Sequence, residues 1–329
     1  MKILLTGAAG FIGYHAALRF LGRGDEVVGI DNLSDYYSVE LKKARLERLS
    51  AFDRFRFAAA DIGDPAQLAA AAGAGGFDAV VHLAAQAGVR YSIENPFPYV
   101  QTNVAGQVAV FEQAARLGRI PVVFASSSSV YGANEKIPFA EADRVDHPVS
   151  VYAATKRAGE LLAHAYGETR GIASTGLRFF TVYGRYGRPD MAPWLFTDAI
   201  LRGEPIQVFN SGAMERDFTH VSDIAAGVVA AADRILARPE ATEAIYNLGN
   251  NDPVRLLDFI AAIERATGRT AKLEMRPKPA GDVVRTFADI SLAARDLGFR
   301  PAVPLDEGIS DFVDWFRAYN GPGKVSAGA

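Results

Sequence analysis

The 329-residue chain contains no cysteine. This excludes disulfide bonds, thiolate catalysis and thiolate metal sites, and it fits a reducing compartment, so we expect a cytoplasmic protein. The five histidines, at positions 15, 82, 147, 164 and 220, do not have the spacing of metal ligands, and no metal site is predicted. His82 lies within an apolar run and is interpreted as a core residue.

The chain also lacks a large excess of either charge: it has 35 lysines and arginines and 38 aspartates and glutamates, which gives a net charge of −3 at pH 7. Nothing in this balance favours binding to nucleic acid or to an anionic membrane. Long apolar runs are missing as well. Glycines 7, 10 and 13 interrupt the apolar N-terminal run, so we interpret it as a strand, turn and helix rather than a signal peptide or membrane span.

These N-terminal glycines have a spacing that indicates a function. Lys2–Thr6 predicts a buried strand, Gly7–Gly13 has the pattern G-x-x-G-x-x-G, and a helix follows to about Arg23. Such glycines allow a tight turn and a close approach of the backbone to a pyrophosphate, whose charge the helix N-terminus stabilises. Glycine-rich turns are common, so the motif alone is weak. The residues predicted to contact a dinucleotide are Gly7, Gly10, Phe11, Ile12 and Gly13.

A second predicted strand, Glu26–Ile30, is followed directly by Asp31, about twenty residues after the glycine motif. A carboxylate at this place accepts hydrogen bonds from the adenosine ribose hydroxyls and repels a 2′-phosphate, which predicts NAD rather than NADP. The alternative is that Asp31 and Asn32 only cap a turn. With the glycine motif before them, we favour cofactor binding by both residues.

The chain then alternates between predicted strands and helices, which is typical of an α/β fold with a doubly wound parallel sheet. In such a sheet ligands bind beyond the carboxyl ends of the strands. There we expect Asp61 to accept a hydrogen bond from the adenine amino group, and the small Ala84 and Ala85 to let a flat cofactor approach. Further residues at these ends are Ile62, Leu83, Ser126–Ser129 and Phe179–Thr181. The predicted strands are Arg54–Ala59, Ala79–Leu83, Pro121–Ser126 and Ala173–Leu177, and the predicted helices are Val39–Leu49, Pro65–Ala72, Val100–Arg116 and Val151–Thr169.

After Thr181 the chain becomes rich in glycine, proline and arginine, and Tyr183–Pro193 is predicted to be a loop. We expect residues 1–185 to form a Rossmann-type NAD-binding domain, to which segments near 216–250 return. The segments 186–215 and 251–320 predict a smaller α/β substrate domain, and 321–329 a frayed tail.

Tyr152 and Lys156 lie four residues apart on a predicted helix, so they share one helix face. A free tyrosine has a pKa of about 10 and is a poor base at neutral pH, but a nearby fixed positive charge lowers this pKa. The pair by itself is also typical of an amphipathic helix with a solvated lysine. Its catalytic interpretation therefore depends on the rest of the chain.

Together, the glycine motif, Asp31, a serine cluster before Val130-Tyr131-Gly132 and the Tyr152/Lys156 pair resemble the extended short-chain dehydrogenase/reductases, NAD-dependent enzymes that modify nucleotide sugars. The resemblance covers essentially the whole chain. Three longer stretches, residues 31–45, 83–92 and 177–192, are similar to one subfamily, the UDP-glucuronate 4-epimerases.

The resemblance implies a reversible 4-epimerisation of UDP-glucuronate to UDP-galacturonate through a 4-keto sugar, with NAD as a bound cofactor. It implies that Tyr152 takes the proton from the 4-hydroxyl and that Ser127 hydrogen-bonds the same hydroxyl. It also implies that Lys156 binds the nicotinamide ribose and lowers the pKa of Tyr152.

The substrate carboxylate needs particular control, because oxidation at carbon 4 gives a β-keto acid that readily loses carbon dioxide. In the resembling subfamily a clamp holds this carboxylate in an unreactive orientation. The alternatives are that each serine bonds its own turn and that Arg188 is a solvated loop charge. We favour the clamp, formed by Ser127, Ser128, Ser129, Thr181 and Arg188, with Phe180 and Met191 beside it.

Three related reactions are disfavoured by missing side chains. Sugar-nucleotide 4,6-dehydratases have Asp-Glu in place of Ser128-Ser129, UDP-glucuronate decarboxylases have a glutamate in the serine cluster, and UDP-galactose 4-epimerases usually have asparagine in place of Thr181. Epimerisation of UDP-glucose and UDP-galactose, or decarboxylation of UDP-glucuronate, stays open as an alternative. A non-catalytic NAD-binding scaffold is a more distant one.

For the UDP half, the resemblance implies contacts from Val208 and Asn210 along the uracil, from Arg216 to the diphosphate and from Asp282 near the ribose. Arg90 faces the phosphates or braces its loop, and the sequence does not decide between the two. Family members often dimerise through two long helices, here Val100–Arg116 and Val151–Thr169, so we expect a homodimer joined by a four-helix bundle.

Overall fold

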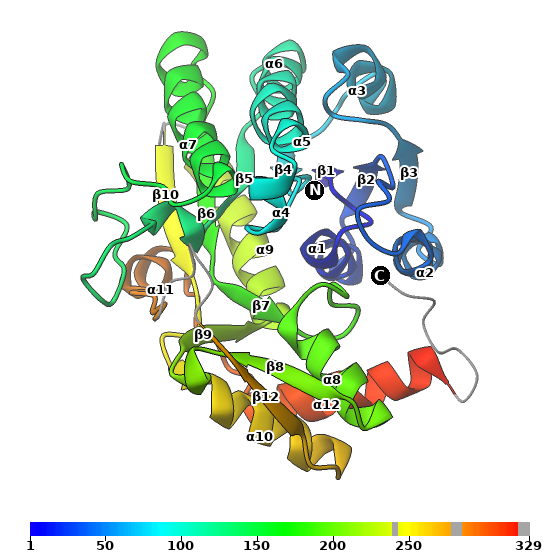
Figure 1. Ribbon diagram of the computed structural model, residues 1–329. Coiled ribbons are helices and arrows are strands. Elements are labelled where there is room, and N and C mark those ends of the chain that lie inside the picture. The colour runs from blue at the N-terminus through cyan, green and yellow to red at the C-terminus, as the bar shows by residue number, and fades with distance from the viewer. Residues whose placement is uncertain (239–242, 278–284, 322–329) are drawn as a thin grey trace.

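A computed structural model describes residues 1–238, 243–277 and 285–321 of the chain (Figure 1). A sheet of seven strands, in the order β10-β6-β5-β4-β1-β2-β3, forms its centre. Every neighbouring pair in this sheet is parallel, which confirms the predicted α/β fold. The strands are β1 (Lys2–Thr6), β2 (Glu26–Asp31), β3 (Phe55–Ala59), β4 (Ala79–His82), β5 (Val122–Ser127), β6 (Ser174–Phe179) and β10 (Glu243–Leu248).

Helices cover both faces of this sheet, and each face has its own hydrophobic core (Figure 1). Because side chains alternate along a strand, Ile3 and Leu5 contribute to one core and Leu4 to the other. Burial on both faces is why the strands are almost continuously apolar. One face is covered by α3 (Pro65–Ala72), α6 (Gly106–Arg116) and α7 (Val151–Arg170), and the other by α1 (Phe11–Gly22), α2 (Val39–Ser50), α9 (Val221–Ala237) and α11 (Ser291–Leu297).

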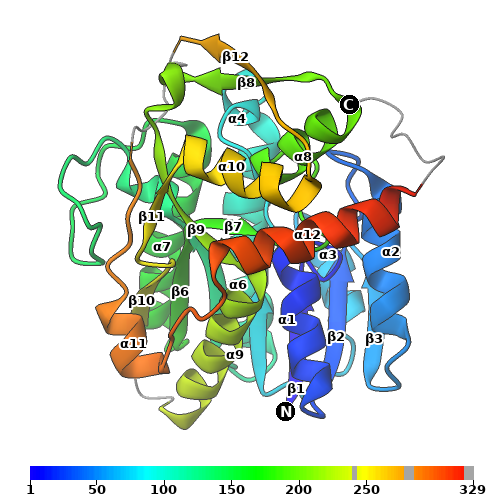
Figure 2. The same cartoon turned by 90° about the horizontal axis from the view of Figure 1, so that it is seen from below.

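A separate core lies where the C-terminal helices pack against two small sheets (Figure 2). It contains large aromatic side chains, among them Trp194, Phe259 and Trp315. One small sheet has the order β11-β9-β7 and the other pairs β12 with β8. The division of the chain into two domains stays a prediction. The elements here are β7 (Thr181–Tyr183), α8 (Ala192–Arg202), β8 (Pro205–Phe209), β9 (Glu215–His220), β11 (Pro253–Arg255), α10 (Leu256–Thr267), β12 (Lys272–Arg276) and α12 (Leu305–Asn320).

Both ends of α7, the helix of Tyr152 and Lys156, are fixed by local interactions. The Ser150 hydroxyl accepts a hydrogen bond from the backbone N–H of Ala153 at 3.1 Å, and Gly171 ends the helix in a left-handed conformation with φ of 62°. Tyr152 and Lys156 therefore lie in the first two turns. Neither α7 nor any other helix in the described ranges is long and apolar enough to cross a membrane.

Two predicted elements differ from the structure. The helix expected at Val100–Arg116 starts earlier, as α5 (Phe97–Val100), and continues through a π-helical turn at Gln101–Ala105 before α6. In this turn, Asn103 exchanges hydrogen bonds of 2.8 and 3.0 Å with the backbone of Gln86. The loop expected at Tyr183–Pro193 ends sooner, because α8 starts at Ala192 with proline in its first turn, where proline is tolerated.

Candidate active site

A cavity of about 890 Å³ lies beyond the carboxyl ends of β1, β2, β4, β5 and β6, bounded on its other side by residues of β8, β9 and α8. This is the place where ligands bind in open parallel α/β sheets. It brings together most of the predicted site residues. Those that line it are Gly7, Gly10, Phe11, Ile12, Gly13, Asp31, Asn32, Ile62, Leu83, Ala84, Ala85, Arg90, Ser127, Ser128, Ser129, Tyr152, Lys156, Phe180, Thr181, Arg188, Met191 and Arg216.

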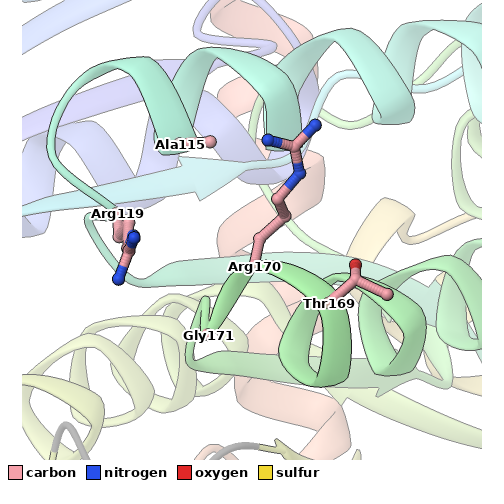
Figure 3. A pocket seen from close by; sticks show the side chains of 5 residues that line it. All are labelled: Ala115, Arg119, Thr169, Arg170 and Gly171. Carbon is pink, nitrogen blue, oxygen red and sulfur yellow. The ribbon is translucent and has the colours of Figure 1, made fainter.

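A second cavity, of about 560 Å³, lies where α6 and α7 end (Figure 3). Arg170 reaches from the end of α7 toward α6, where it forms an ion pair of 3.5 Å with Glu112. No predicted site residue lines this cavity, so we assign the chemistry to the first one. The lining residues are Ala115, Arg119, Thr169, Arg170 and Gly171.

The glycine turn has the geometry of a phosphate-binding turn. Gly7 has φ of 77°, and a β-carbon added there would lie 2.6 Å from the backbone nitrogen of Ala84. Gly10 precedes α1 without a capping side chain, so the first N–H groups of this helix lack both intrahelical and side-chain acceptors. The turn and the helix N-terminus therefore fit a pyrophosphate.

Asp31 is fixed at the end of β2 by two backbone donors. Its carboxylate accepts hydrogen bonds from the N–H groups of Ala9 at 3.1 Å and Leu33 at 2.8 Å. Nearby, the Lys42 ammonium donates to the carbonyl oxygen of Ser34 at 2.6 Å and also lines the cavity. Lys42 was not among the predicted site residues, because only the fold brings α2 to this edge of the sheet.

Tyr152, Lys156 and Ser127 meet in the same cavity. Burial raises the pKa of Tyr152 above its ordinary value, while a hydrogen bond with Ser127 and the charge of Arg188 act to lower it. Burial also lowers the pKa of Lys156 to about 8, and Glu160 opposes this change. The lowering of the tyrosine pKa by Lys156 stays a prediction.

Ser127 both closes its own turn and lies at the predicted catalytic site, the two interpretations that the sequence left open for the serine cluster. Its hydroxyl accepts a hydrogen bond from the backbone N–H of Ser129 at 3.2 Å, as expected for a serine that closes its own turn. The same hydroxyl donates to the Ser129 hydroxyl at 3.2 Å and hydrogen-bonds Tyr152. The turn therefore fixes Ser127 next to the tyrosine.

A buried polar network supports these residues from behind. Arg178 donates to both carboxylate oxygens of Glu160, at 2.8 and 2.9 Å, and Ser126 donates to Glu160 at 2.6 Å. The Arg178 and Glu160 side chains are only 3% and 1% exposed. The network joins α7, which carries Tyr152, to β5, which carries Ser127, and to β6, the strand that leads to Thr181.

The guanidinium of Arg188 is already paired. Its Nε donates to Oδ1 of Asp190 at 3.0 Å and its Nη2 donates to Oδ2, while the Tyr36 hydroxyl donates to the same Oδ2 at 3.2 Å. Burial disfavours the charge on Arg188, but Asp190 together with Tyr36 and Tyr37 outweighs this effect, so the pKa of Arg188 is raised. Tyr36 and Asp190 were not predicted as site residues, although both lie in stretches that carry the family resemblance.

Three predicted residues do not line the cavity. Val208 is fully buried in the C-terminal core, because side chains alternate along β8 and its neighbours Gln207 and Phe209 face the cavity instead. The Asn210 side chain donates to the carbonyl oxygen of Ala213 at 3.0 Å. Asp61 accepts a hydrogen bond from the Gly63 N–H at 2.7 Å, within its own turn, and another from the Asn32 side chain at 3.0 Å. Asp282 lies outside the described residues.

Two arginines predicted to serve the nucleotide, Arg90 and Arg216, also line the cavity. The Arg90 guanidinium is 4.9 Å from the ring centre of Phe209, which fits bracing of its loop, and it also lines the cavity. Arg216 donates from Nη1 to the carbonyl oxygen of Glu215 at 2.9 Å. The described residues contain no group of three or more metal-ligating side chains.

Known proteins resemble this chain in sequence and in structure. The chain matches the NAD dependent epimerase/dehydratase family over residues 3–249. It is 43% identical to the probable UDP-glucuronate 4-epimerase of Rhizobium meliloti strain 1021, over 96% of this chain and 97% of that protein. The structure of the UDP-glucuronic acid 4-epimerase of Bacillus cereus, in complex with UDP-glucuronic acid and NAD, is 34% identical with a TM-score of 0.88, over 97% of this chain and 100% of that chain.

A second solved structure shows that the fold does not select the sugar. The UDP-glucose 4-epimerase of Thermotoga maritima, with UDP-glucose, has a TM-score of 0.86 at 28% identity, over 98% of this chain and 100% of that chain. Two enzymes named for different sugars thus resemble this chain almost equally in shape. The side chains of the cavity have to distinguish the sugars.

The glycine turn yields a prediction about NAD. Gly13→Ala would place a methyl group against the carbonyl oxygen of Gly7, so the turn must open. We expect the affinity for NAD to fall at least about tenfold, equivalent to ~1.4 kcal/mol, in a calorimetric titration. Gly22→Ala is the matched control, because it lies in the same helix with no atom within 4 Å of the added carbon. Equal NAD affinities of the two variants would contradict the assignment of this turn.

Proposed function

Because the chain belongs to the NAD dependent epimerase/dehydratase family, we propose that it interconverts UDP-glucuronate and UDP-galacturonate by epimerisation at carbon 4. One observation supports this choice above all. A tyrosine–lysine–serine group shares its cavity with an arginine and with serines at positions 128 and 129, where dehydratases have acids. Such a cavity suits a sugar that is oxidised while its own carboxylate is held.

NAD, when bound, would supply the hydride acceptor for oxidation at carbon 4 of the sugar and the hydride donor for re-reduction of the 4-keto sugar. The residues that would hold this cofactor are on different elements. The Gly7–Gly13 turn binds the pyrophosphate, Asp31 and Asn32 bind the adenosine ribose, and Lys156 binds the nicotinamide ribose.

Tyr152 is the proton carrier of the proposed reaction. As phenolate it accepts the proton of the 4-hydroxyl, and it returns the proton when the ketone is reduced. A hydrogen bond with Ser127 acts to lower the pKa of Tyr152, and in this proposal Ser127 also binds the same sugar hydroxyl. The Lys156 ammonium, one helical turn away, stabilises the phenolate.

Ser128, Ser129, Thr181 and Arg188 control the sugar carboxylate in this proposal. Hydroxyl groups and a guanidinium fork are suitable donors to a carboxylate. None of them supplies the acid that expulsion of a 6-hydroxyl requires. The same residues give an uncharged hexose fewer contacts than a hexuronic acid.

We also propose a homodimer, joined through a four-helix bundle of α5–α6 and α7 from each subunit. Large apolar side chains are exposed on these helices: Phe97 is 81%, Val100 49% and Leu161 56% exposed. Exposed apolar groups that gather on neighbouring helices favour an interface with a second copy.

The cytoplasm is the location that we propose for the enzyme. The chain has no cysteine that would need an oxidising compartment. Fractionation of cells that express the tagged protein tests this location, and recovery outside the cytoplasm would contradict it.

The reaction itself is tested by incubation of the protein with UDP-glucuronate and NAD, followed by separation of the products. We expect UDP-galacturonate as the main product. Tyr152→Phe should abolish turnover, because the phenol hydroxyl carries the proton, while NAD stays bound. A UDP-pentose as the main product, or exchange of UDP-glucose with UDP-galactose only, would replace the proposal by one of the related reactions.

A pH profile tests the role of Lys156. Its ammonium is present below the pKa of about 8 and is lost above it. We therefore expect kcat/KM for UDP-glucuronate to fall as the pH rises through about 8, since this parameter reports the free enzyme. Lys156→Arg keeps the charge at every tested pH and should lose this alkaline limb, whatever its residual activity. An unchanged limb in Lys156→Arg would assign it to another group.

The dimer is tested by light scattering coupled to size exclusion. The wild-type protein should have the mass of two chains, and Leu161→Arg should shift it toward one chain, because the charge cannot be buried at an apolar interface. Leu273→Arg, on β12, is the control, since Leu273 is 44% exposed outside these helices. A monomeric wild-type protein would contradict the proposed dimer.

A further inference from the structure

One edge of Arg188 is occupied within the protein, although the proposed function requires this residue for the substrate. Nε and Nη2 both donate to the Asp190 carboxylate, and Tyr36 donates to the same carboxylate. The side chains of Arg188 and Asp190 are 18% and 34% exposed, and both residues line the main cavity. The guanidinium is therefore held by its partners rather than solvated.

The pairing leaves the other edge of Arg188 available. A guanidinium has five N–H donors in a planar fork, and a carboxylate uses the donors of one edge. Nη1 of Arg188 donates no hydrogen bond within the part of the chain that the structure describes. The edge formed by Nη1 and the second N–H of Nη2 can donate hydrogen bonds to a second carboxylate. The pairing with Asp190 fixes the direction of these donors.

A row of tyrosine rings connects this pair to the proton carrier. The ring of Tyr36 lies 5.0 Å from that of Tyr91, Tyr91 lies 6.3 Å from Tyr99, and Tyr99 lies 6.1 Å from Tyr152. The Tyr99 hydroxyl donates to the carbonyl oxygens of Ala87 and Gly88, at 2.9 and 2.6 Å, which fixes the row on the backbone. Arg188 and Tyr152 line the same cavity, and the charge of Arg188 acts to lower the pKa of Tyr152.

Asp190 also compensates the charge of Arg188. A lone guanidinium taken out of water is costly unless a partner is present. With Asp190 the pair is neutral, and the Tyr36 hydroxyl holds the carboxylate in place. Recognition of a second carboxylate then depends on the direction of the free edge more than on net charge.

We propose that Asp190 and Tyr36 are positioning residues that fix one edge of Arg188, so that its other edge holds the carboxylate of the hexuronic acid. The inference rests on the proposed function and deepens it. In the 4-keto sugar, the bond between carbons 5 and 6 breaks when it aligns with the π orbitals of the ketone. Carbon dioxide then leaves, the electron pair forms the enolate of carbons 4 and 5, and protonation at carbon 5 gives a 4-keto pentose. Return of the hydride that was removed in the first oxidation reduces this ketone to the UDP-pentose. A fixed guanidinium edge prevents that alignment.

The experiment compares product partition in Asp190→Asn and Tyr36→Phe with the wild type, on NAD-loaded protein and UDP-glucuronate. We expect the ratio of UDP-pentose to UDP-galacturonate to rise about tenfold in Asp190→Asn, a difference of ~1.4 kcal/mol between the two barriers. A smaller rise in the same direction is expected in Tyr36→Phe, where Asp190 remains. A merely structural role would lower both products alike and leave their ratio unchanged.

The chain offers a matched control for this experiment. Arg144 and Asp146 form an ion pair with the same spacing of two residues, at 3.0 Å, with side chains 90% and 47% exposed and outside the cavity. Asp146→Asn should keep the wild-type ratio, and Asp190→Glu, which restores the carboxylate, should return the ratio part of the way. Thermal unfolding of each variant shows whether it is folded.

The outcomes separate this inference from the proposed function. A wild-type protein that does not epimerise UDP-glucuronate contradicts both. A wild-type protein that epimerises, with the same product ratio in Asp190→Asn, contradicts only the positioning role. Calorimetric binding of UDP-glucuronate gives a second readout: tighter binding to Asp190→Asn would show that Asp190 competes with the substrate, and would overturn the inference.

Discussion

The buried ion pair between Glu160 and Arg178 is the interaction on which the geometry of the site depends. It joins α7 to β6, and Ser126 ties β5 to the same carboxylate. Removal of one partner of such a pair leaves an uncompensated buried charge, at a cost of roughly 3–5 kcal/mol. Two residues of the proposed mechanism, Ser127 and Lys156, lie one residue and one helical turn from this network. Their relative positions are therefore set by the core rather than by flexible loops.

The cofactor half of the site could be predicted from the sequence because its requirements are local. A tight turn needs glycine at Gly7 and Gly13, where an added β-carbon would meet the backbone, and this leaves a readable pattern. The position of Asp31 could be predicted because one helix and one strand separate it from the glycine motif. The large sheet could also be predicted from the sequence, since buried parallel strands are short apolar runs in regular alternation with helices.

The sugar half could be predicted only in part, because it depends on pairings between distant segments. Tyr36 and Asp190 are 154 residues apart and meet only in the folded chain. Val208 was expected at the ligand from its place in a motif, whereas the alternation of β8 turns it to the core. A one-residue shift in a strand exchanges the two faces, and a resemblance along the chain does not reveal this detail.

The pairing of Arg188 with Asp190 has a consequence for sugar selection. If Arg188 were unpaired, an uncharged hexose would leave a desolvated cation in the closed site, and the penalty would reject that sugar strongly. Because Asp190 neutralises it, an uncharged hexose loses only the hydrogen bonds of one guanidinium edge. Hydrogen bonds to a charged group contribute about 1.5–3 kcal/mol each, so discrimination by this residue is moderate. The arrangement therefore controls the orientation of the carboxylate in the 4-keto intermediate more than it excludes uncharged sugars. A reaction through a β-keto acid requires this control of orientation.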